Sequence, residues 1–107
     1  MEELQQAAFE MIAVIGQAKG YFFQAVDAAR KGKLQEAKQM MQQGNQILNE
    51  AHKHHFSFIQ QEASGISLPY SILFMHAEDQ LLTTAMMKEM CEQLMEVYSD
   101  INELKTT

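Results

Sequence analysis

Apolar residues recur every three or four positions along most of the chain, which is the spacing of one face of an α-helix. The pattern is interrupted at Gly32 and again between Gly65 and Pro69. It therefore predicts three helices, over about residues 2–30, 34–62 and 70–104. Gly32 is expected to end the first helix in a left-handed conformation, and Pro69 is expected in the first turn of the third. Connections this short make successive helices antiparallel, so the predicted fold is an up-down-up three-helix bundle.

The composition supports this all-α prediction. The chain has 107 residues, enough for one domain spanning 1–107, and 47% of them are hydrophobic, which allows a packed core. Proline occurs once, and helix-favouring Ala, Leu, Met, Gln, Glu and Lys dominate. The single cysteine, Cys91, is expected to be a small buried residue, and its lack of a disulfide partner fits a reducing compartment. No stretch approaches the ~20 apolar residues of a membrane span, and the acidic start does not resemble a signal peptide, so we expect a cytoplasmic protein.

Charge and motifs exclude several classes of function. The formal net charge is −6, and binding to a phosphate backbone needs a basic face, so nucleic acid is not an expected partner. The chain contains no P-loop, no G-x-G-x-x-G and no G-x-S-x-G sequence. His52, His54 and His55 on the second helix offer too few ligands for a four-ligand metal site and are expected to be partly exposed.

The third predicted helix carries a long apolar face that begins with two polar residues. This face, called the stripe below, consists of His76, Asp79, Thr83, Met86, Met90, Leu94, Val97, Ile101 and Leu104. An ionised carboxylate facing a helix seam is costly unless it is paired, hydrated or bound to metal. Because Asp79 and Gln80 lie three and four residues after His76, the three side chains form a candidate site. Such a cluster suits proton transfer, metal binding or phosphoryl capture, and spacing alone does not choose among them.

The third helix is apolar well beyond the stripe. Further apolar residues beside it are Leu73, Leu81, Leu82, Ala85, Met87, Cys91, Met95 and Tyr98. Two partner helices would struggle to cover so broad a surface, so we expect the chain to form a homo-oligomer through this helix. Several copies of Asp79 would then meet near a symmetry axis. On the first helix, Gly16 and Gly20 are expected where a neighbouring helix approaches closely.

Short sequences in register with the three predicted helices resemble a known family. They are Gly16-Gln17-Ala18-Lys19, Ala29-Arg30-Lys31-Gly32-Lys33-Leu34, Leu48-Asn49-Glu50-Ala51-His52 and His76-Ala77-Glu78-Asp79-Gln80-Leu81-Leu82-Thr83. Together they resemble the IIA component of the lactose/cellobiose/chitobiose class of the bacterial phosphoenolpyruvate-dependent sugar phosphotransferase system. The last sequence is similar to the family signature His-Ala-Gln-Asp-His-Leu-Met-Thr.

The resemblance implies a phosphotransferase-type phosphoryl carrier that assembles as a trimer of three-helix hairpins. His76 matches the histidine that forms a transient phosphohistidine. Asp79 matches the aspartate that gathers at the trimer axis and binds a divalent cation, for which Mg²⁺ best suits oxygen ligands. Gln80 stands where the family has a second histidine, and its amide is a neighbour of the phosphoryl group that can donate a hydrogen bond.

The implied partners are the general phosphocarrier protein, which supplies the phosphoryl group, and a IIB component, which receives it. The pathway serves uptake of a β-linked disaccharide of the cellobiose, chitobiose or lactose class, and it reaches the membrane only indirectly, through the sugar transporter. The chain departs from the family at Gln80, at Glu78, where the family has glutamine, and at His55-Phe56, where it has Gln-Thr. The alternative function is a non-catalytic helical oligomeric adaptor or regulatory paralogue, in which His76 and Asp79 only fix the register of the helices.

Overall fold

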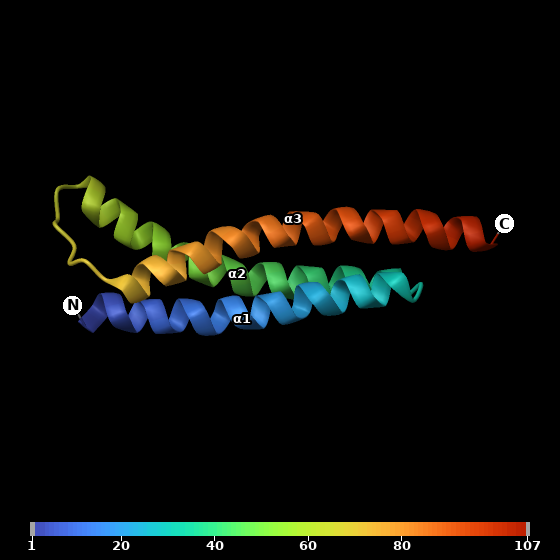
Figure 1. Cartoon of the computed structure of the whole chain (residues 1–107), viewed down its shortest axis with the longest axis horizontal. Helices are drawn as coiled ribbons and strands as arrows, with labels where there is room; N and C mark the ends of the chain where they lie inside the picture. The colour runs from blue at the N-terminus through green and yellow to red at the C-terminus, as the bar shows by residue number, and fades with distance from the viewer. Residues whose placement is uncertain (1, 107) are drawn as a thin grey trace.

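The computed structural model describes residues 2–106, which form three antiparallel helices in a rod of 60 × 21 × 18 Å (Figure 1). The helices are α1 (Glu2–Arg30), α2 (Leu34–Ala63) and α3 (Ile72–Thr106). The predicted all-α, up-down-up arrangement is confirmed, and no strand occurs among these residues. The far end of α3 runs past the turn that joins α1 to α2 (Figure 1). No helix between residues 2 and 106 has the length and apolar character needed to cross a lipid bilayer.

Glycine ends both of the first two helices in the same way. Gly32 has a φ of 82°, and its amide donates a hydrogen bond of 3.0 Å to the carbonyl of Ala29. The next amide, of Lys33, reaches back to the carbonyl of Ala28 at 2.9 Å, which completes a Schellman motif. The expected role of Gly32 is therefore confirmed. Gly65, with a φ of 100°, ends α2 in a matching turn.

The third helix begins two residues later than predicted, and Pro69 lies in the linker before it. The reason is the hydroxyl of Ser71, which accepts a hydrogen bond of 3.1 Å from the amide of Phe74. A serine that binds an amide three residues on is a favoured N-cap, and it fixes the first helical residue at Ile72. The prediction that Pro69 starts the helix was wrong because it ignored this competing signal.

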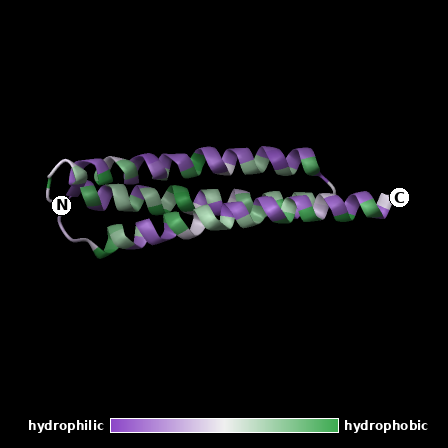
Figure 2. Cartoon of the chain, turned by 90° about the horizontal axis from the view of Figure 1, so that it is seen from above, coloured by the Kyte–Doolittle hydropathy of each residue, from purple (hydrophilic) through white to green (hydrophobic). Residues whose placement is uncertain are grey.

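The core lies along α1, which packs against both other helices, while α2 and α3 meet each other less closely. Each helix carries both hydrophobic and hydrophilic residues along its length (Figure 2). The buried residues of α3 are Phe74, Ala77, Leu81, Thr84, Cys91 and Met95. Cys91 is buried as predicted, and burial raises the pKa of its thiol, so the neutral form that suits an apolar core is favoured.

Close helix packing occurs at a different glycine from those predicted. A Cβ atom added to Gly16 or Gly20 would lie more than 4 Å from every atom of α2 and α3, so neither helix approaches these residues. A Cβ on Gly44 of α2 would lie 2.6 Å from Cε1 of Phe22 on α1. The prediction was therefore wrong for this chain, because the two α1 glycines face away from α2 and α3. Gly44 lets the fully buried Phe22 ring lie against the α2 backbone.

Candidate functional site

The residues predicted to form the site lie near the start of α3, within one continuous helix. His76 and Asp79 are exposed, and Gln80 is partly buried. The side chains of His76 and Asp79 form no hydrogen bond or ion pair with any residue from 2 to 106. Both groups are therefore accessible to a ligand or a partner protein.

Gln80 is held by a lysine on another helix, which residue spacing along α3 does not indicate. Nζ of Lys19, on α1, donates a hydrogen bond of 2.5 Å to Oε1 of Gln80. The two residues are 61 positions apart, so only the packing of α1 against α3 brings them together. The one available signal was that Lys19 ends the Gly16–Lys19 sequence, which belongs to the family pattern.

Two of the departures from the family pattern meet each other across the α2–α3 interface. Nε2 of His55 lies 2.6 Å from Oε2 of Glu78, and the two side chains are 17% and 32% exposed. Glu78 is two residues after His76, which places it roughly 200° around the helix from that histidine. Its carboxylate is therefore directed toward α2 and paired there, away from the side of α3 that carries His76.

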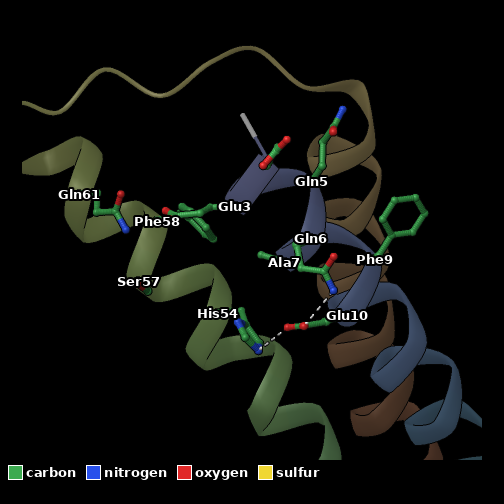
Figure 3. A pocket seen from close by; sticks show the side chains of 11 residues that line it. Glu3, Gln5, Gln6, Ala7, Phe9, Glu10, His54, Ser57, Phe58 and Gln61 are labelled. Carbon is green, nitrogen blue, oxygen red and sulfur yellow. Dashed lines mark hydrogen bonds and ion pairs between the residues drawn. The ribbon is translucent and has the colours of Figure 1, made fainter.

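The neighbouring histidines of α2 point to different partners. His54 lies 3.6 Å from the carboxylate of Glu10, in a groove of ≈ 710 Å³ between α1 and α2 (Figure 3). Burial, and then the positive charges of His55 and Lys88, lower the pKa of His52. Within residues 2–106 no three histidine, cysteine or acidic side chains gather in a way that would hold a metal ion.

The cation predicted at Asp79 therefore needs more than one copy of the chain. The carboxylate fits the role, since it is exposed, has no partner among residues 2–106, and offers the oxygen ligands that Mg²⁺ prefers. A single carboxylate completed by water is a weak site, whereas several carboxylates near a symmetry axis would be a strong one.

The stripe lies on the outside of the single chain. Its apolar members include Met86 (60% exposed), Met90 (58%), Leu94 (43%), Val97 (50%) and Ile101 (38%). At about 100° per residue, the stripe is centred roughly 135° around α3 from the face that packs on α1 and α2. The helix thus has two apolar faces, and only one of them is covered by its own chain. An exposed apolar face of this length is typical of a protein–protein interface.

The fold and the site define a class of small helical protein in which an accessible histidine, His76, lies on a helix whose outer face offers a protein–protein interface. The chain belongs to the lactose/cellobiose-specific IIA family of the sugar phosphotransferase system, because residues 6–99 match the family described as PTS system, Lactose/Cellobiose specific IIA subunit.

Individual relatives agree with this assignment. The lactose-specific EIIA component of Staphylococcus aureus (strain N315) is 36% identical over 97 residues, which is 91% of this chain and 94% of that protein. The crystal structure of the cellobiose-specific enzyme IIA from Bacillus anthracis is 30% identical, with a TM-score of 0.88 over 94% of this chain and 92% of that one. The chitobiose IIA of Escherichia coli, solved in complex with HPr, is 29% identical, with a TM-score of 0.82 over 95% of this chain and 99% of that one.

Proposed function

We propose that this protein carries a phosphoryl group on His76, taking it from the general phosphocarrier protein and giving it to a IIB component. The observation that carries the proposal is that His76 is exposed and unpaired within residues 2–106. Its sequence context, His76 to Thr83, resembles the signature of the family, and it lies within the matched range 6–99. The solution structure of the E. coli chitobiose IIA with HPr supports the choice of phosphoryl donor.

The first step transfers the phosphoryl group from a histidine of the donor protein to His76. A neutral ring nitrogen of His76 attacks the phosphorus of the donor's phosphohistidine, so that one N–P bond forms as the other breaks. In the second step a cysteine thiolate of the IIB component attacks the same phosphorus. The S–P bond forms, the N–P bond breaks, and the His76 ring returns to its neutral form. Such transfers depend mainly on alignment and on stabilising the charge of the phosphoryl oxygens, so an accessible nucleophile is the main requirement.

The proposed assembly is a homotrimer held by the apolar part of the stripe of α3, from Met86 onward, which leaves His76 accessible. The exposed apolar face supports this proposal, because a free chain would present it to water. Asp79 would then hold a divalent cation such as Mg²⁺ together with its two symmetry copies. The ion would neutralise carboxylates that otherwise repel one another.

The proposed cargo of the pathway is a β-linked disaccharide. Relatives named for lactose, cellobiose and chitobiose support this class of sugar. Transfer from the phosphorylated protein to purified IIB components of the lactose and the cellobiose class would compare the two routes directly.

The test of the carrier function is labelling from phosphoenolpyruvate by the general phosphotransferase proteins. The wild type should gain one acid-labile phosphate per chain, His76→Ala should gain none, and His54→Ala, which removes another partly exposed histidine, should label as the wild type does. Labelling of His76→Ala at the wild-type rate would contradict the assignment of the residue. An unlabelled wild type that still self-associates would favour the non-catalytic adaptor.

A further inference from the structure

Gln80 differs from the family signature in a way that changes what its neighbour Lys19 can do. The signature places histidine at this position, and a histidine can carry a positive charge as well as donate a hydrogen bond. Glutamine can only donate or accept, depending on which end of its amide is presented. The hydrogen bond from Lys19 decides which end that is.

We propose that Lys19 is a positioning residue for phosphoryl transfer at His76, acting through the Gln80 amide. The inference rests on the proposed function of His76. An ammonium group has hydrogens to offer and no acceptor, so the group it binds must be the amide oxygen, Oε1. The opposite end of the amide, the NH₂ group, is thereby left as the end available to a ligand.

This orientation suits a phosphoryl group on His76. Gln80 is four residues after His76, so the two side chains are neighbours on the helix surface. Phosphoryl oxygens accept hydrogen bonds and carry a charge of about −1.5 to −2 in total when the group is on a side chain. The NH₂ end of the amide would stabilise that charge, whereas the oxygen end would oppose it.

Without Lys19 the amide has no such preference. The last torsion of a glutamine side chain is broad and roughly two-fold, so both ends can face the same place. A charge-assisted hydrogen bond from a lysine removes that ambiguity before the phosphoryl group arrives. Lys19 also supplies the positive charge that glutamine lacks. The signature histidine can both carry a positive charge and donate a hydrogen bond. Here Lys19 on α1 carries the charge, and Gln80 on α3 donates the hydrogen bond.

The test compares rates of phosphorylation in the full-length protein. Lys19→Met should lower the maximal rate at saturating phosphocarrier protein by roughly tenfold. This is less than the loss of about 10²–10³ on removing a well-placed donor outright, because the Gln80 amide remains and loses only its fixed orientation. Lys19→Arg should restore most of the rate, because arginine also donates and never accepts. Lys105→Met, at the far end of α3, is the matched control and should behave as the wild type.

The decisive variant restores the signature histidine. In a Gln80→His background, Lys19→Met should lower the maximal rate by a much smaller factor than in the wild type, since a histidine ring needs no lysine to orient an amide. If Lys19 only ties α1 to α3, Lys19→Met would instead lower the thermal midpoint equally in both backgrounds and leave the maximal rate unchanged.

The outcomes separate the two proposals. Wild-type protein that labels on His76, together with Lys19→Met at an undiminished rate, would overturn the role of Lys19 and leave the carrier function intact. Equal loss of rate in the wild-type and Gln80→His backgrounds would also overturn it, because the effect would not pass through the amide. Wild-type protein that gains no phosphate on His76 would overturn both.

Discussion

The packing of α1 against α2 makes a quantitative prediction for Gly44→Ala. The added methyl would lie 2.6 Å and 2.9 Å from two ring carbons of Phe22 and 3.1 Å from Cβ of Tyr21. Carbon atoms prefer a separation of about 3.5–4.0 Å. The Phe22 ring is 0% exposed and cannot swing into solvent, so the helices must separate. Overpacking of this kind costs about 1–3 kcal/mol, and three short contacts favour the upper end.

The gain in helix propensity on replacing glycine offsets up to about 1 kcal/mol of that cost. We therefore expect Gly44→Ala to lower the free energy of unfolding by about 2 kcal/mol and the thermal midpoint by roughly 8 °C or more. Gly16→Ala is the matched control, because its added Cβ would lie more than 4 Å from every atom of α2 and α3. It gains the propensity without the clash, so its midpoint should rise by a few degrees.

Both variants should be measured by circular dichroism at one protein concentration, since association makes the midpoint depend on concentration. Phe22→Leu gives a second check. This substitution should lower the free energy of unfolding less in the Gly44→Ala protein than in the wild type, because the smaller side chain relieves the clash with the added methyl group. A Gly44→Ala protein as stable as Gly16→Ala would refute the close approach of the two helices.

Three further predictions concern α3. Met90→Glu should convert the assembly to folded monomers in sedimentation equilibrium, because it places a charge in the middle of the exposed apolar stripe. Gln46→Glu, on the exposed surface of α2, is the control and should keep the mass of the wild type. An unchanged mass for Met90→Glu as well would exclude the stripe as the interface. The thermal midpoint of the wild type should rise with Mg²⁺ and fall with EDTA, whereas Asp79→Asn should respond to neither; equal responses would remove Asp79 from the metal site. Thr84→Val should raise the free energy of unfolding by about 1 kcal/mol, because the Thr84 hydroxyl is buried and has no hydrogen-bond partner among residues 2–106. A less stable variant would contradict this reading of the hydroxyl.

Much of the fold could be predicted from local spacing. A period of three to four residues marked each helix, and Gly32 marked an end, because both signals act over a few neighbouring residues. The start of α3 was harder, since Pro69 and Ser71 are both suitable starting residues and only the hydrogen bond to Phe74 decides between them. The sequence also indicated that the apolar surface of α3 is too broad for the other two helices of the chain to cover. It did not indicate which of its apolar residues would face α1 and α2, because that choice depends on how the other helices approach.

The candidate site could also be predicted only in part, because some of its residues lie on one helix and others on different helices. His76, Asp79 and Gln80 share one stretch of helix, so their spacing alone brought them to notice. The contact between Lys19 and Gln80 joins residues 61 positions apart, and that between His55 and Glu78 joins residues 23 positions apart. No periodicity within one helix predicts such pairs. They depend on the relative rotation of two helices, which is set by the packing of the whole core.

The outward position of His76 has a consequence for timing. When a reactive group is enclosed by its own protein, the opening of a loop or lid can set the rate of the reaction. His76 is already exposed in the resting chain, so no such movement has to precede contact with another protein. At partner concentrations below saturation, the rate of the proposed transfer then depends on the frequency of encounters, which rises with the concentration of the partners and with attraction between opposite charges. For a chain of net charge −6, added salt should slow the approach of a basic partner surface. Below saturation, the supply of partner molecules would then set the rate of the proposed step.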